Sequence, residues 1–309
     1  MIAFVNGEYF PDDEPRISVH DRGLMFGDSV FDIARTYGGK PFRLEQHLDR
    51  LERSMRYVEL DVDGLMGEIT EATHEVLARN ADEISEVGDV FVEQIVTRGV
   101  IASPASNDAD RATVIVKLRP VYFPVFAQYY EEGLDLSVSL LNVSFTGPVD
   151  PRAKAANRLA NARADLKGQR ARRQGVRGSW TIMFSPDGSI PETNAANICI
   201  VEGSTLVTPP RYERLGGISL DTLIELADSI GLHVSERRIF PYDLLNADEA
   251  MLTATSFGVL PVFAADGIRV GRGRETFDRL LAAWIDLVDF DFVAQARERA
   301  GRAPGAVGS

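Results

Sequence analysis

The chain has 309 residues, of which 45% are hydrophobic and 26% charged, as in an ordinary globular protein large enough for two domains. The formal net charge of −13 argues against a nucleic-acid or anionic-membrane partner, because phosphate groups are bound by clustered positive charge. The single cysteine, Cys199, excludes an internal disulfide, and its apolar run NICIV predicts a buried thiol rather than a nucleophile. The start MIAFVNGEYF lacks a signal-peptide pattern and no apolar run reaches about 18 residues, so a cytoplasmic protein is expected.

Residues 1–120 predict an N-terminal α/β domain. Asn6-Gly7 and Gly38-Gly39 are turn signals beside runs of apolar and aromatic residues. In two later segments, apolar residues recur at three- and four-residue steps, which is the period of an amphipathic helix. The expected strands are 1–10, 29–42, 91–100 and 113–121, and the expected helices are 44–58 and 65–77.

Residues 121–133 (VYFPVFAQYYEEG) show no strand alternation and are interrupted by proline, so they are predicted as an interdomain linker. A C-terminal α/β domain is expected over 134–289, followed by a flexible tail at 290–309 that has little apolar content. The expected strands of this domain are 134–144, 179–190, 197–210, 233–240, 249–255 and 260–270, and the expected helices are 155–172, 219–230 and 274–288.

Lysine is rare in this chain, which has four lysines (Lys40, Lys117, Lys154 and Lys167) against 29 arginines. Only a primary amine condenses with an aldehyde to form a Schiff base, and a guanidinium does not. Lys154 follows Pro151 at a strand-to-helix corner, where side chains often project into a site. Lys154 is therefore a candidate for Schiff-base chemistry, the alternative being that four lysines persist by chance.

Three further features could belong to a site for a cofactor with a phosphate and a pyridine ring. GGISLDTLIELADSIG (216–231) places two glycines before a helix that Ser219 would cap, which suits a phosphate, although an ordinary capped helix has the same pattern. The hydroxyls of TATS (253–256) would add donors to the same anion. Glu192, between Ile190-Pro191 and the small residues TNAAN, is either a solvated turn carboxylate or the partner of a protonated pyridine nitrogen.

In this order, six segments resemble the fold-type IV pyridoxal-phosphate enzymes, the class IV aminotransferases. The resemblance covers about residues 3–285 and implies two α/β domains, a pyridoxal 5′-phosphate cofactor and a homodimer whose partner subunit lends residues to the pocket. It rests on DRGLMFGDSVFDIARTYGGKPFRLEQHLDRL (21–51), FVEQIVTRG (91–99), DPRAKAANRL (150–159), GSIPETNAANICIVEGSTLVTPP (188–210), GGISLDTL (216–223) and ADEAMLTATSFGVLPV (247–262).

The resemblance also implies roles for individual residues. Lys154 matches the Schiff-base lysine, which moves the proton between the substrate carbon and cofactor C4′, and Glu192 matches the glutamate that pairs with the pyridine nitrogen. The cofactor phosphate would be held by residues from three segments, Arg50, Ile218 with Ser219, and Thr255. No metal ion is expected.

The segment around Arg98 resembles the D-amino-acid and (R)-amine transaminases, in which an arginine at this position meets the substrate carboxylate, and it lacks the Tyr-x-Arg pattern of branched-chain enzymes. Phe31 stands where D-amino-acid enzymes carry a tyrosine. Arg158 stands where branched-chain enzymes carry one, and Asn-Arg-Leu here resembles aminodeoxychorismate lyase. Arg35 and Arg158 are candidate carboxylate ligands, with a surface or interface salt bridge as the alternative. The expected substrate-binding residues are Phe31, Arg35, Arg98, Arg158 and Ser256.

We therefore expect a transaminase that moves an amino group between a D-amino acid or (R)-primary amine and a 2-oxo acid, such as pyruvate or 2-oxoglutarate, by a ping-pong mechanism. The alternatives are an aminodeoxychorismate lyase, a branched-chain amino-acid aminotransferase, and a catalytically silent homologue. The joint presence of Lys154, Glu192 and Arg50 argues against the last of these.

Overall fold

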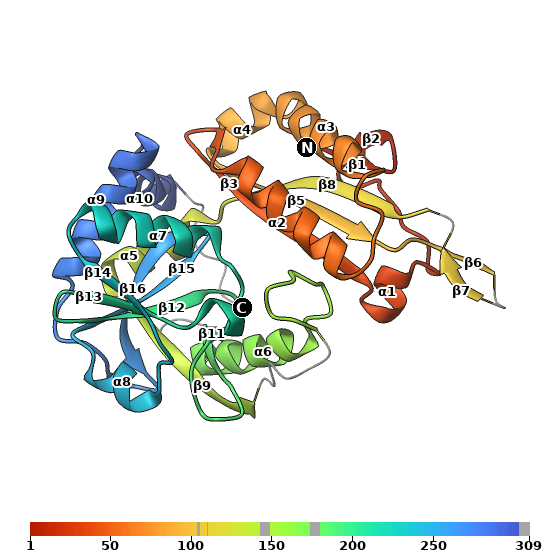
Figure 1. The fold of residues 1–309 in the computed structure, drawn as a ribbon. Helices are drawn as coiled ribbons and strands as arrows, with labels where there is room; N and C mark the ends of the chain where they lie inside the picture. Colours follow the sequence, from red (N-terminus) through yellow and green to blue (C-terminus); the bar gives the residue numbers. More distant parts are fainter. Residues whose placement is uncertain (104–105, 110, 143–148, 174–179, 303–309) are drawn as a thin grey trace. The chain divides into compact units, whose positions relative to one another are not determined.

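The computed structural model describes residues 1–103, 106–109, 111–142, 149–173 and 180–302 (Figure 1). The chain forms two compact units. The first unit contains Met1–Val121 and Ala153–Arg158, and the second contains Tyr122–Arg152 and Leu159–Ser309. Both units combine helices with strands, which confirms the predicted α/β class. In the described part of the chain, no helix is long and apolar enough to cross a membrane.

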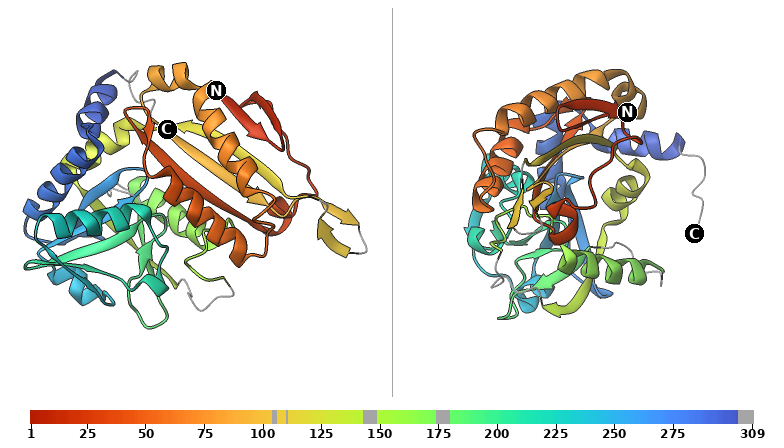
Figure 2. Two further views of the ribbon diagram at one scale, coloured as in Figure 1. Left: turned by 45° about the horizontal axis from the view of Figure 1, so that its top comes forward. Right: turned by 90° about the vertical axis from the view of Figure 1, so that its right-hand side faces the viewer.

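The first unit is built on a six-stranded antiparallel sheet with the order β2-β1-β8-β5-β3-β4. Helices α2 and α3 lie against this sheet (Figure 2). Alternate residues of each strand point to opposite faces, so Val30 and Ala34 join the core formed with these helices. The strands are β1 (Ile2–Val5), β2 (Glu8–Pro11), β3 (Ser29–Tyr37), β4 (Lys40–Pro41), β5 (Val90–Thr97) and β8 (Thr113–Pro120). The other elements are α1 (Arg22–Phe26), α2 (Leu44–Tyr57), α3 (Met66–Arg79), α4 (Ala81–Val87) and a ribbon of β6 (Ile101–Ser103) and β7 (Ser106–Ala109).

The second unit contains a nine-stranded mixed sheet with the order β11-β10-β9-β16-β15-β12-β13-β14, in which β17 pairs with β16. Its central strands β12 and β15 are buried along nearly their whole length, as expected for strands that are covered on both faces. The strands are β9 (Leu134–Asn142), β10 (Thr181–Phe184), β11 (Glu192–Thr193), β12 (Asn197–Glu202), β13 (Thr205–Thr208), β14 (His233–Glu236), β15 (Glu249–Ala254), β16 (Gly258–Ala265) and β17 (Ile268–Arg269). The helices are α5 (Phe123–Glu132), α6 (Leu159–Arg173), the 3-10 helix η1 (Arg211–Glu213), α7 (Ile218–Ser229), α8 (Pro241–Asn246), α9 (Glu275–Val288) and α10 (Phe292–Arg302).

The segment predicted as a linker, 121–133, instead contains helix α5, which belongs to the second unit. Phe123, Phe126 and Tyr130 follow a helical spacing and are buried. The proline in this segment lies in the first turn of the helix, where a missing backbone N–H leaves no hydrogen bond unmade. The linker prediction was wrong because a proline in this position begins a helix rather than interrupting one.

The expected flexible tail is wrong for most of its length, because Phe292–Arg302 form helix α10. Phe292, Val293 and Ala296 are buried, and the Phe292 ring centroid lies 6.0 Å from that of Tyr130 on α5. The three buried residues are interspersed with charged and polar ones, so the sequence of α10 shows little apolar content. Residues 303–309 lie outside the described part of the chain.

One buried charged cluster lies beneath the sheet of the first unit, where Asp32 on β3 meets two side chains of α2. The Oδ atoms of Asp32 accept from Arg50 Nε at 2.8 Å and Nη2 at 2.7 Å, and His47 Nδ1 lies 2.7 Å from Oδ1. Asp32 is fully buried, and burial alone would raise its pKa, but the Arg50 charge and the His47 hydrogen bond hold it well below its ordinary value. Because an ionised carboxylate only accepts, His47 Nδ1 carries the proton of that bond.

We expect Phe292→Ala to destabilise the protein by about 3–5 kcal/mol, since it removes a fully buried ring and leaves a cavity against α5. Chemical denaturation monitored by circular dichroism measures this loss. Leu287→Ala is the control, because Leu287 at the end of α9 is 47% exposed. Equal stability of the two variants would contradict a packed α10.

The His47 imidazole predicts how stability depends on pH. Burial lowers the pKa of His47 in the folded protein, aided by the charges of Arg50 and Lys154 and opposed by Asp32. The unfolded chain takes up a proton below about pH 6.5, so this contribution to stability is complete above that pH and decreases as the pH falls toward the folded pKa. We expect His47→Asn to have a shallower dependence of unfolding free energy on pH in this window. The exposed His233→Asn is the control and should keep the wild-type slope.

Candidate functional site

Lys154 is held by its backbone against β3 in the first unit, not in the C-terminal domain to which the sequence argument assigned it. Its carbonyl accepts from Phe31 N at 3.0 Å, its own N–H donates to Ser54 Oγ at 3.0 Å, and its neighbour Ala156 donates to Ser29 O at 2.8 Å. The helix expected to begin at residue 155 begins at Leu159. The lysine therefore lies on a short extended segment that is fixed on both sides.

The Lys154 amine lies over an aromatic ring. Nζ is 4.7 Å from the centroid of Phe31, and the guanidinium carbon of Arg158 is 5.7 Å from the same centroid. Phe31 is flanked across the sheet by Ile95 on β5, which in turn pairs with Ile115 on β8. The lysine therefore lies at one end of an apolar row formed on the face of the sheet opposite to the helices.

Arg50 is oriented by the charged cluster beneath β3. Asp32 receives both Nε and Nη2 of this guanidinium, a fork that fixes the plane of the group as well as its position. The Arg50 side chain is only 6% exposed, yet its charge is balanced by the ionised Asp32. The orientation of this guanidinium is therefore already fixed by the protein itself.

In the second unit, Glu192 begins β11 and faces Asn197 of β12 across an antiparallel pair. Its Oε2 accepts from the backbone N–H of Leu215 at 3.2 Å and from Asn197 Nδ2 at 3.4 Å. Hydrogen bonds to the charged form stabilise a carboxylate. Glu192 is therefore placed by its neighbours, rather than left as a mobile turn residue.

Helix α7 begins differently from the sequence prediction. Gly217 is the N-cap and brings no side-chain acceptor, so Ile218 and Ser219 are the first two helical residues and Ser219 is not the cap. Backbone N–H groups at such a helix start attract anions. Thr255 and Ser256 lie in the turn between β15 and β16, a turn of the same unit.

Arg98, expected to bind the substrate carboxylate, is engaged elsewhere. Its Nε donates to Asp28 at 2.8 Å, while its terminal nitrogens donate to Glu59 O at 3.0 Å and to the carbonyl of Val58, the C-cap of α2. These contacts satisfy carbonyls at a helix C-terminus, which is a structural role. The prediction for Arg98 is not supported by its contacts.

The other two arginines predicted to bind substrate, Arg35 and Arg158, lie in different surroundings. Arg158 shares the Phe31 ring with Lys154, whereas Arg35 is buried with its guanidinium 4.6 Å from the Tyr37 ring centroid. Sequence reasoning missed Asp32, His47 and Asn197 altogether. The spacing of His47 and Arg50 on one helix face was a usable signal for the first cluster, whereas nothing in the sequence marks Asn197 as a partner of Glu192.

Two further features concern the cysteine and the possible metal ligands. Burial raises the pKa of the Cys199 thiol to about 12, so it stays protonated, as predicted for a structural cysteine. Among the described residues, no group of three His, Cys, Asp or Glu side chains is placed to hold a metal ion.

Comparisons with known proteins show the family to which the chain belongs. The branched-chain-amino-acid aminotransferase of Escherichia coli is 29% identical over 275 residues, which cover 87% of this chain and 86% of that protein. A crystal structure of the E. coli branched-chain enzyme has a TM-score of 0.80 at 28% identity, covering 93% of this chain and 94% of that one. The branched-chain aminotransferase of Thermoproteus uzoniensis with norvaline has a TM-score of 0.76 at 26% identity, with 94% and 95% covered. The family model for amino-transferase class IV matches residues 29–265, and the chain belongs to this family of pyridoxal-phosphate enzymes.

Proposed function

We propose that this class IV aminotransferase transfers the amino group of branched-chain L-amino acids to a 2-oxo acid. The observation that carries the proposal is the apolar row Phe31–Ile95–Ile115, which begins under the Lys154 amine. An aliphatic side chain gains by leaving water for such a surface, whereas a polar side chain would lose hydrogen bonds. The relatives from E. coli and T. uzoniensis carry branched-chain names, which supports the same substrate class.

The residues present fit pyridoxal phosphate. Its pyridinium ring supplies an electron sink for the charge that forms when the substrate α-carbon loses a proton. We propose that Lys154 provides the amine and that its Nζ carries the proton between the α-carbon and cofactor C4′. Glu192, held by two N–H donors, would keep the ring nitrogen protonated. Arg50, the first turn of α7 at Ile218 and Ser219, and Thr255 would bind the phosphate.

The D-amino-acid and (R)-amine function predicted from the sequence is less well supported, because Arg98 donates to Asp28 and to the end of α2. One observation still favours it as a second candidate. Strand β5 has Phe91 and Glu93 and contains no tyrosine, unlike the Tyr-x-Arg pattern of branched-chain enzymes. With Arg98 engaged, Arg35 and Arg158 remain the candidates for the substrate carboxylate. A homodimer and a cytoplasmic location also remain predictions.

A half-reaction panel tests the substrate class. The purified yellow protein is mixed with one donor at a time, without acceptor, and the loss of its visible absorption is followed. We expect L-leucine to bleach the band faster than D-alanine or (R)-1-phenylethylamine. Bleaching by the (R)-amine alone would overturn the branched-chain assignment, and pyruvate release from aminodeoxychorismate would indicate a lyase.

Borohydride reduction followed by peptide mass spectrometry tests the role of Lys154. The cofactor should be found on Lys154, and Lys154→Arg should abolish both the covalent adduct and transamination, because a guanidinium keeps the charge but does not condense. Lys40→Arg is the matched control, since Lys40 is exposed on β4. Recovery of the adduct on Lys117 or Lys167 would refute this assignment.

A further inference from the structure

We propose that Asn197 is a positioning residue that couples the carboxylate of Glu192 to the start of helix α7. The inference rests on the proposed function, in which Glu192 meets the ring nitrogen of the cofactor and α7 meets its phosphate. Asn197 is 5% exposed and belongs to the same unit as both groups, so the coupling is internal to that unit.

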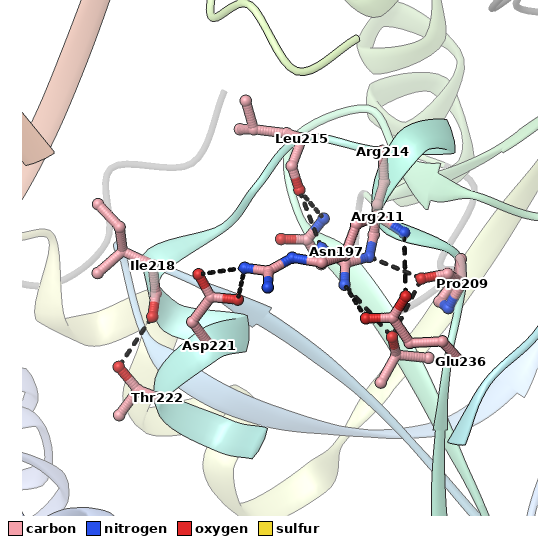
Figure 3. A network of polar contacts seen from close by, with 10 residues as sticks. Asn197, Pro209, Arg211, Arg214, Leu215, Ile218, Asp221, Thr222 and Glu236 are labelled. Atoms are coloured by element: carbon pink, nitrogen blue, oxygen red, sulfur yellow. Dashed lines mark hydrogen bonds and ion pairs between the residues drawn. The ribbon is translucent and has the colours of Figure 1, made fainter. Parts of the chain in front are cut away.

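The peptide of Leu215 is the centre of this coupling (Figure 3). Its N–H donates to Glu192 Oε2 at 3.2 Å. Its carbonyl accepts from Asn197 Nδ2 at 3.2 Å and from Arg214 Nη1 at 3.3 Å. The same carbonyl also accepts from Gly217 N at 2.8 Å. Asn197 Nδ2 also donates to Glu192 Oε2 at 3.4 Å. One amide group thus contacts the acid and the loop that leads into α7.

Asn197 is also in close steric contact with Gly217, the N-cap of α7. A Cβ built at Gly217 would lie only 2.0 Å from Asn197 Oδ1, a distance at which one of the two must move. Gly217 has φ −72 and ψ 121, which an alanine adopts without strain, so an alanine here would be opposed by its contact with Asn197 rather than by the backbone. Gly216, one residue earlier, would meet nothing within 4 Å.

Hydrogen bonds of Arg214 and Arg211 also hold the loop that leads into α7, so Asn197 contacts a segment that is already fixed. Arg214 is fully buried and donates from Nε to Pro209 O at 2.8 Å, and burial lowers the pKa of its guanidinium. Arg211 donates to both carboxylate oxygens of Asp221 in the first turn of α7, at 3.0 and 3.2 Å (Figure 3). With these contacts in place, the distance from Glu192 to the helix start depends on the Asn197 amide.

The first experiment needs no cofactor. A double-mutant cycle on the apo protein measures the unfolding free energy of Asn197→Ala, Gly217→Ala and the double variant. We expect Gly217→Ala to destabilise the wild type but to cost little more in the Asn197→Ala background, because the clashing Oδ1 is gone. Gly216→Ala is the matched control and should be additive with Asn197→Ala. Additivity for Gly217→Ala as well would overturn the steric coupling.

The second experiment measures cofactor binding by equilibrium dialysis and by the pH titration of the visible band of bound pyridoxal phosphate. We expect Asn197→Ala to raise the Kd about tenfold or more and to shift the titration, because the partner of the ring nitrogen is displaced. Asn197→Asp should bind more weakly still, since it keeps the shape but places a second carboxylate beside Glu192.

Asn80→Ala is the stability control. Asn80 is a fully buried asparagine of the first unit with hydrogen bonds of 2.6–2.9 Å to Ile2 and Val76, so its loss should lower stability without shifting the titration. Wild-type Kd and titration in Asn197→Ala would overturn the inference while leaving the proposed function intact. A wild-type protein that takes up no pyridoxal phosphate would instead overturn the proposed function, and with it the role of Asn197 toward the cofactor.

Discussion

The buried ion pair between Asp32 and Arg50 is the interaction on which the first unit depends. Removing two charges from water is costly, and the pair persists because both carboxylate oxygens and the His47 proton are used in hydrogen bonds. It links β3 to α2, which are also joined through the apolar core. The strand that carries Asp32 on one face carries Phe31 on the other, so one β-strand positions both a guanidinium and the ring beneath a lysine.

The two units use the same physical arrangement. In each, a charged group proposed to meet the cofactor is oriented by neighbours that need not touch it. Asp32 fixes the plane of Arg50 in the first unit, and Asn197 with the Leu215 peptide fixes Glu192 in the second. Such support lowers the reorganisation needed when a ligand binds, because the groups are already in place.

Local sequence was a good guide where chemistry restricts residue type. A Schiff base needs a lysine, so Lys154 stood out among 29 arginines, and the motifs around Arg50 and Glu192 supported the same family that the comparisons show. Sequence reasoning failed where a contact decides the role. The hydrogen bonds of Arg98 to Asp28 and to Glu59 just after α2 join residues far apart in the chain, and the substrate role expected for Arg98 stays a prediction that these contacts do not support. Helix α5 was missed because a proline was taken as a break when it only begins the helix.

The sequence by itself determined the α/β class, through residue types and periodicities within short segments, and the resemblance of six of its segments to a known family implied the family and with it the cofactor. Only the tertiary structure decided which unit holds Lys154, that Ser219 lies inside α7 rather than capping it, and that Asn197 contacts both Glu192 and Leu215. The placement of Lys154 depends on its hydrogen bond with Phe31, 123 residues away, and the contact of Asn197 with Leu215 joins residues 18 apart. No local pattern encodes such pairings, since they arise only when the sheets form and bring the strands into register.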